Sequence, residues 1–117
     1  MFINLTNHSS AYWSEEQLEK ARMWGEVVDL PFPVVDPFLD REGIAALARD
    51  YSIKCLDMLT DNEGAVHVMG EHTLTYALVN ELKRHGVLCL ASTSQRKTIE
   101  ENGSKLSEFC FCNFREY

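Results

Sequence analysis

The sequence lacks the glycine-rich and paired-cysteine motifs that identify several large classes of enzyme. It contains no G-x-G-x-x-G and no Walker loop, which disfavours a dinucleotide-dependent oxidoreductase and a P-loop nucleotidase. Its four cysteines form no C-x-x-C pair, so the strong signal for zinc is missing, and we expect buried free thiols in a reducing compartment. Cys110 and Cys112 fall on one face of a predicted strand and leave a shared metal open as the less favoured interpretation.

Long apolar runs and an excess of basic residues are also missing. No stretch approaches the roughly 20 apolar residues of a membrane span, and Asn4, Thr6 and Asn7 interrupt the start where a signal peptide has its apolar segment. Eleven Lys and Arg against eighteen Asp and Glu give a formal charge of -7, which argues against a general electrostatic grip on duplex DNA. We therefore expect a cytoplasmic protein that binds any anionic ligand in a local pocket.

The 117 residues are enough for one domain over 1–117, built from alternating strand and helix patterns. Four apolar runs predict strands at residues 2–5, 26–30, 65–69 and 87–91. Helical patterns with capping signals predict helices at residues 14–25, 40–59 and 74–86. A turn is expected at 61–64, and Asn102-Gly103 fits a type I′ turn that joins 95–100 to 107–114 as a hairpin.

This order of elements predicts the fold class. Strands that alternate with helices imply right-handed crossovers and a mainly parallel sheet with helices on both faces. The prediction is a small Rossmann-like three-layer sandwich, β-α-β-α-β-α-β, with the C-terminal β-hairpin extending one edge. The apolar, low-charge end SEFCFCNF is an adhesive sheet edge, which favours pairing with a second subunit.

In open parallel sheets, ligands bind outside the carboxyl ends of the strands, where loops carry the functional residues. This rule selects three polar loops, at residues 6–10, 70–73 and 92–96. In the first loop His8 is a candidate general acid or base near neutral pH, with Asn7, Ser9 and Ser10 beside it. A capping or loop-fixing role for His8 is the alternative.

The second loop leads into a helix. Gly70 allows the backbone to pass close to a ligand, and free N–H groups of Glu71, His72 and Thr73 then favour a phosphate at the helix N-terminus. A plain tight turn with Thr73 as a cap is the alternative. His72 is a second candidate acid or base. Glu71 is the only carboxylate in the three loops, so we expect neither a divalent metal nor a cofactor.

The third loop offers hydroxyl and guanidinium donors. Thr93, Ser94 and Arg96 are suited to fixing phosphate or ribose oxygens, and a solvated start of the hairpin is the alternative.

Three further side chains carry an ambiguous signal. Trp13 lies near the first loop, where it either stacks on a base or closes the core. His67 alternates with valines inside a strand and is expected in the core or an interface. His85 is expected as a charge at a helix C-terminus.

Four segments together resemble a known family: FINLTNH, EVVDLPFPVVDP, AVHVMGEHTLTYALVNELKRHG and VLCLASTSQR. They are similar to the small single-domain CRISPR-associated proteins of type III systems that are related to CARF (CRISPR-associated Rossmann fold) domains. That group includes ring nucleases and other binders of cyclic oligoadenylates, and the resemblance covers most of the chain. It implies a homodimer, with higher assemblies also open, that binds cyclic tetra-adenylate across its two-fold axis and switches off type III CRISPR signalling.

The resemblance also implies roles for the loop residues. Cleavage in such enzymes resembles metal-free RNA scission, in which the ribose 2′-hydroxyl attacks its own 3′-phosphate. His8 would be the acid or base and His72 the alternate catalyst, while Asn7, Ser9 and Ser10 orient ribose and phosphate. The backbone at 70–73 and Arg96 would stabilise the charge on the phosphate.

Two other functions remain open at this point. A non-catalytic protein that sequesters the same messenger needs nearly the same loops. A nucleotide- or sugar-phosphate-binding Rossmann-like protein unrelated to CRISPR fits the same pattern, because this fold hosts many functions.

Overall fold

The computed structural model describes residues 1–60 and 63–117, and within them one five-stranded sheet has the order β2-β1-β3-β4-β5. The strands are β1 (Phe2–Thr6), β2 (Val27–Asp29), β3 (Ala65–Met69), β4 (Leu88–Glu101) and β5 (Ser104–Glu116). The helices are α1 (Glu15–Ala21), α2 (Arg41–Met58) and α3 (His72–Arg84), with 3-10 turns η1 (Ser10–Tyr12) and η2 (Arg22–Trp24). Strands β1 to β4 pair in parallel and β5 pairs antiparallel with β4. The predicted mixed, mostly parallel α/β sheet with a C-terminal hairpin is confirmed.

Two of the predicted helix starts are also confirmed by their caps. The Ser14 hydroxyl accepts a hydrogen bond from the Gln17 N–H at 3.2 Å, and Asp40 accepts one from the Gly43 N–H at 2.8 Å. The turn expected at 61–64 includes Asp61 and Asn62, which lie outside the described residues. Among the described residues, no helix combines the length and the apolar composition that a membrane crossing needs.

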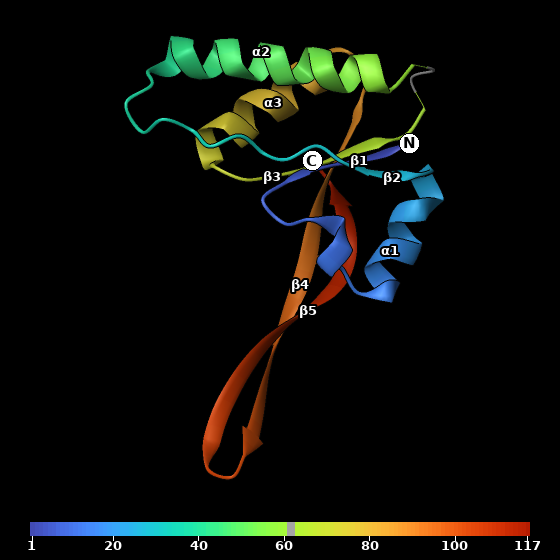
Figure 1. Ribbon diagram of the computed structural model, residues 1–117, viewed down its shortest axis with the longest axis vertical. Helices are drawn as coiled ribbons and strands as arrows, with labels where there is room; N and C mark the ends of the chain where they lie inside the picture. Colours follow the sequence, from blue (N-terminus) through green and yellow to red (C-terminus); the bar gives the residue numbers. More distant parts are fainter. Residues whose placement is uncertain (61–62) are drawn as a thin grey trace.

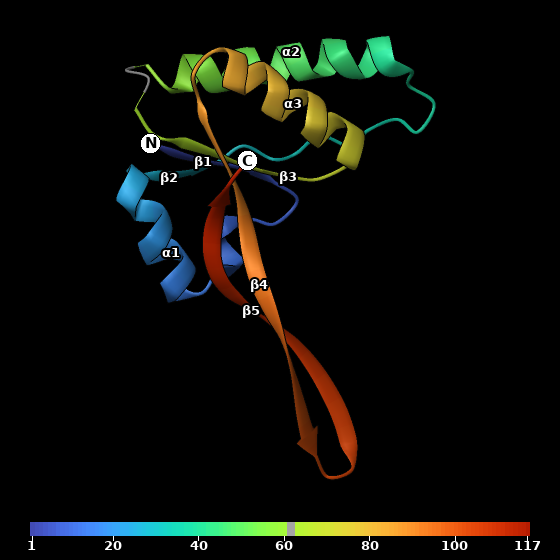
Figure 2. The same cartoon turned by 180° about the vertical axis from the view of Figure 1, so that it is seen from behind.

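Different helices pack against the two faces of the parallel part of the sheet. Figures 1 and 2 show α2 and α3 over one face and α1 on the opposite side. Against α2 and α3 the sheet presents an apolar core that includes Ile3, Leu5, Val66 and Val68. The α1 face carries Phe2, Ala65, Leu90 and Phe114, but also buried Asn4, Thr6 and His67. Because buried polar groups need partners, this second face is where a polar site forms.

The hairpin of β4 and β5 extends far beyond the body of the molecule (Figure 1). With the hairpin included, the longest dimension of the molecule is 51 Å. Asn102 and Gly103 have φ of 53° and 80°, as a type I′ turn requires, so the predicted turn is confirmed. The predicted loop at 92–96 is wrong, because these residues continue β4. Ser94 pairs with Phe111 and Arg96 with Phe109. The backbone of these residues therefore belongs to the antiparallel ladder and is not free, as it would be in a loop.

The core under α3 provides a test of the packing. Leu78 is fully buried between α3 and the sheet, whereas Tyr76 on the same helix is 74% exposed. We expect Leu78→Ala to lower the free energy of unfolding by about 2–5 kcal/mol through lost burial and the cavity left behind. Tyr76→Ala, the matched control, should change it by less than about 1 kcal/mol. Urea denaturation measures both, and equal effects would contradict this packing.

Candidate functional site

A cleft of about 420 Å³ lies at the carboxyl ends of β1 and β3, beside β4. The strand order reverses here, since β2 lies on one side of β1 and β3 on the other. The crevice at such a reversal is the usual ligand site of open α/β sheets. We call it the carboxyl-edge cleft. Its lining residues are Thr6, Asn7, His8, Tyr12, Trp13, Gln17, His67, Met69, Gly70 and Ser92.

A buried polar network fastens the loop that carries His8. The Asn4 side-chain amide donates to the His8 carbonyl at 2.8 Å and to the Asp29 carboxylate at 2.9 Å. The Thr6 hydroxyl accepts the His8 N–H at 3.2 Å and lies 2.9 Å from the Asn4 side-chain oxygen. The main chain of His8 is thus held at both its N–H and its carbonyl. His8 is exposed and lines the cleft, so its imidazole is attached to a main chain whose position is fixed.

His67 is the fifth member of this network. It is 3% exposed, and its Nδ1 lies 3.1 Å from Oδ1 of Asn4. Because the Asn4 amide nitrogen faces two groups that only accept, Oδ1 must face His67, and Nδ1 therefore carries the proton. Nε2 is then a bare lone pair, buried and without a partner among the described residues. Burial lowers the pKa of His67 to about 4, so the ring is neutral at pH 7.

The ring of His67 lies in an aromatic cluster on the α1 face. Its centroid is 5.9 Å from that of Phe2, 5.5 Å from that of Trp13 and 5.3 Å from that of Phe114. The expectation that His67 is a core residue is confirmed. His67 also lines the cleft, which was not predicted. The polar residues Asn4 and Thr6, which share one face of an otherwise apolar strand, could have indicated a polar site on that face.

Asp29 at the end of β2 ties the first loop to the sheet. It accepts hydrogen bonds from the Ser9 hydroxyl at 3.2 Å and from the Ser10 N–H at 3.2 Å. Partial burial raises its pKa, but the hydrogen bonds from Asn4, Ser10 and Ser9 outweigh this and lower the pKa below its ordinary value. Ser9 and Ser10 do not line the cleft, so their role toward ribose and phosphate stays a prediction. Asp29 was not predicted as a site residue.

The start of α3 differs from the expectation. The Glu71 carboxylate accepts the N–H groups of Thr73 at 3.0 Å and Leu74 at 2.9 Å, so the prediction of a free Thr73 amide is wrong. These hydrogen bonds lower the pKa of Glu71. The chain's own carboxylate therefore occupies the position where an anion would bind. At Gly70 an added Cβ would lie 2.5 Å from the Phe32 ring, so packing against that ring requires the glycine.

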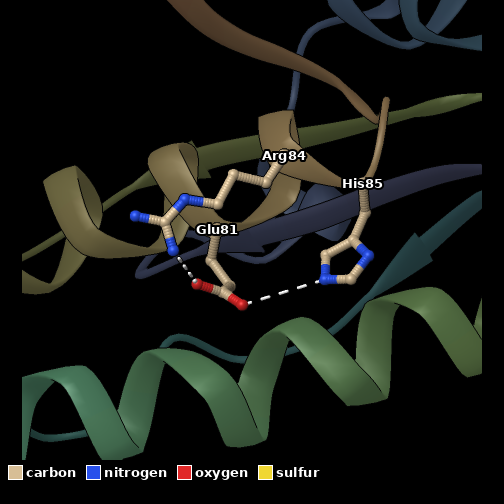
Figure 3. A network of polar contacts seen from close by, with 3 residues as sticks. All are labelled: Glu81, Arg84 and His85. Carbon is tan, nitrogen blue, oxygen red and sulfur yellow. Dashed lines mark hydrogen bonds and ion pairs between the residues drawn. The ribbon is translucent and has the colours of Figure 1, made fainter.

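His72 lies apart from His8. It lines a larger groove of about 720 Å³ between α2 and α3 instead of the carboxyl-edge cleft. The same helix ends in a polar cluster shown in Figure 3, in which the half-buried Glu81 lies 3.2 Å from Arg84 and 3.8 Å from His85. The expected place of His85 at a helix C-terminus is confirmed, since it is the C-cap of α3.

The predicted residues of the third loop are held within the hairpin. The Thr93 hydroxyl donates to the Asn113 carbonyl at 3.2 Å, and the Arg96 guanidinium donates to the Ser107 hydroxyl at 2.9 Å. Neither these residues nor Ser94 line the cleft, whereas Ser92 does. Of the predicted site residues, the structure brings Asn7, His8 and Gly70 together. Trp13 joins them, because it both packs on the core and lines the cleft.

The cysteines are free thiols in two environments. Cys55 and Cys89 are buried, and burial raises their pKa to about 12 and about 11. Cys110 is partly buried. Cys112 is exposed, so the expectation of burial is wrong for this residue, which lies at a bulge opposite Thr93 and Ser94, between the paired residues Phe111 and Asn113. No group of three or more His, Cys, Asp or Glu side chains suited to a metal ion occurs in the described ranges.

Comparison with known proteins places the chain within one family. The family described as "Uncharacterized protein MJ1673 family" matches residues 1–115. No curated protein and no solved structure matches the chain.

The buried state of His67 generates a prediction about acid stability. The unfolded chain protonates this ring near pH 6.5, but the folded protein does so only at about 4. Between these values the unfolded state binds more protons, so stability falls as the pH falls through this window. We expect the residue to account for a loss of about 3 kcal/mol in the free energy of unfolding between pH 7 and pH 4.

Urea denaturation across that range measures this loss. His67→Gln should lack most of the acid-induced loss that the wild type shows. His85→Gln, in which an exposed histidine is replaced, should retain it. An unchanged pH dependence in His67→Gln would show that His67 is not the responsible group.

Proposed function

The chain belongs to the MJ1673 family, and from that premise we propose that it is a Rossmann-like protein that binds cyclic tetra-adenylate in the carboxyl-edge cleft and cleaves it without a metal. The proposal combines the resemblance to CARF-related proteins with the position of the cleft at the β1/β3 reversal. The observation that carries it is the position of His8, whose main chain is fixed by Asn4 and Thr6 and which is an exposed residue in the lining of the cleft. Removal of the messenger would switch off type III CRISPR effectors.

The remaining cleft residues suit an oligoadenylate. Tyr12 is 89% exposed and Trp13 is half-buried, so both offer ring surface on which an adenine can stack. Asn7 and Gln17 add amide donors and acceptors for ribose hydroxyls and base edges.

The chemistry needs few groups. The ribose 2′-oxygen forms a bond to its own 3′-phosphorus, the bond from phosphorus to the 5′-oxygen breaks, and a 2′,3′-cyclic phosphate and a 5′-hydroxyl result. As a base, His8 accepts the 2′-hydroxyl proton, and as an acid it donates a proton to the departing 5′-oxygen. In-line positioning of the ribose and phosphate supplies the rest of the acceleration.

The exposed hairpin supports a homodimer. Ile99 is 45%, Leu106 58% and Phe109 71% exposed, and the first two form a cross-strand pair. An isolated two-stranded ribbon is marginally stable in water, so a ribbon of this length with three exposed apolar side chains favours a covering partner. The ribbon residues 94–110 carry three basic and three acidic side chains, so they do not repel a second acidic subunit. A two-fold dimer also matches a symmetric ring ligand.

A second candidate function is binding without cleavage. The cleft lining within the described residues includes no Lys or Arg, Arg96 lies on the hairpin, and Glu71 occupies the start of α3. Few donors are thus available for the extra phosphate charge of a transition state. This favours a protein that sequesters the messenger, alone or in higher assemblies.

One assay separates the two candidates. Labelled cyclic tetra-adenylate is incubated with the protein in EDTA and analysed on native and denaturing gels. We expect a shifted band and shortened products, with turnover reduced about 100-fold or more in His8→Ala and binding retained. His85→Ala, outside the cleft, is the matched control and should turn over like the wild type.

Other outcomes of this assay are equally informative. A shift with intact ligand supports sequestration. If cyclic tetra-adenylate and cyclic hexa-adenylate neither bind nor react, the proposed function is wrong.

The dimer is tested separately by sedimentation. Leu106→Ser combined with Phe109→Ser should convert a dimer into a monomer, because it removes the apolar surface of the ribbon. Val34→Ser, at a site 99% exposed on a different part of the surface, should leave the dimer intact. A wild-type protein that sediments as a monomer at the concentrations used for binding would contradict the dimer.

A further inference from the structure

Among the described residues, one buried hydrogen-bond acceptor in the wall of the carboxyl-edge cleft has no donor within the protein. Nε2 of His67 is unpartnered among the described residues, although the residue is 97% buried and its other ring nitrogen is hydrogen-bonded. A buried polar atom without a partner costs stability unless something binds it. His67 also lines the carboxyl-edge cleft, so a ligand is the natural source of the missing donor.

The tautomer of His67 decides what kind of group can bind. The Asp29 carboxylate and the His8 carbonyl orient the Asn4 amide, and Asn4 in turn places the proton on Nδ1. Nε2 can therefore only accept. A donor N–H or O–H is required from the ligand, and a phosphate oxygen or a carbonyl would be repelled.

The surroundings decide between a base and a sugar. The His67 ring lies among Phe2, Trp13 and Phe114, an apolar aromatic wall that suits the flat face of a purine better than a hydrated ribose. The only exocyclic donor on the Watson–Crick edge of adenine is its N6 amine. The half-buried Trp13 packs edge-on against the His67 ring at 5.5 Å and also lines the cleft, and a rotamer change of this side chain, of a kind common on binding, would admit the base.

We propose that Nε2 of His67 is the base-reading acceptor of the cleft and accepts a hydrogen bond from the N6 amine of an adenine. The inference rests on the proposed function and adds its specificity-determining residue. It accounts for a preference for adenine over hypoxanthine, whose oxygen at position 6 would face the lone pair of Nε2.

Calorimetry with two ligands tests the inference. Cyclic tetra-adenylate should bind the wild type about 10-fold or more tightly than cyclic tetra-inosinate, because hypoxanthine in the same pose places an oxygen opposite Nε2 where adenine places its N6 amine. His67→Phe keeps a ring of similar size without the acceptor and should reduce this preference to about 3-fold or less. His85→Phe is the matched control and should preserve the preference.

A second measurement avoids dependence on a variant that fails to fold. In wild-type protein with ¹⁵N-labelled histidine, the Nε2 resonance of His67 should have the shift of an unprotonated nitrogen and move upfield with cyclic tetra-adenylate. It should not move in the same direction with cyclic tetra-inosinate.

The outcomes distinguish this inference from the function beneath it. Equal affinity of the wild type for both rings, or an Nε2 resonance unmoved by saturating cyclic tetra-adenylate, overturns the base-reading role and leaves the binding function intact. Failure of every adenine ring to bind overturns both.

Discussion

The buried side-chain amide of Asn4 is the contact on which the cleft depends. It joins β1 to the end of β2 through Asp29, to the first loop through the His8 carbonyl and to β3 through His67. Its direction is forced, because a carboxylate and a carbonyl can only accept. From that one orientation follow the position of the His8 main chain, the proton on Nδ1 of His67 and the lone pair on Nε2. In a low-dielectric interior, such a network stabilises one arrangement and penalises the alternatives.

The fold was largely predictable because most elements have a local signal. Ser14 and Asp40 cap helices through their own side chains, and Asn102-Gly103 adopts the positive φ angles that its turn demands. The length of β4 had no such signal. Its continuity through 92–94, between the predicted strand at 87–91 and the predicted hairpin strand at 95–100, depends on pairing with β5, a contact that the local sequence does not describe.

The location of the candidate site could be predicted from the sequence, but the hydrogen-bond network that supports it could not. The strand-end rule placed Asn7, His8 and Gly70 at the cleft, yet the network beneath them depends on register, since Asn4 reaches His67 only because these residues are partners on β1 and β3. Glutamate is also not among the preferred helix caps. The sequence therefore left an open helix start and a cap by Thr73 as the two alternatives, and Glu71 fills that position instead.

The start of α3 is closed by its own side chain. Many nucleotide-binding folds hold their ligand by its phosphates at an open helix N-terminus. Here a resident carboxylate already occupies two of those amides. Inorganic phosphate and free mononucleotides, abundant in any cell, find no general phosphate cradle at this helix. A ligand recognised through its bases and its shape can then be bound in the presence of a large excess of simpler anions.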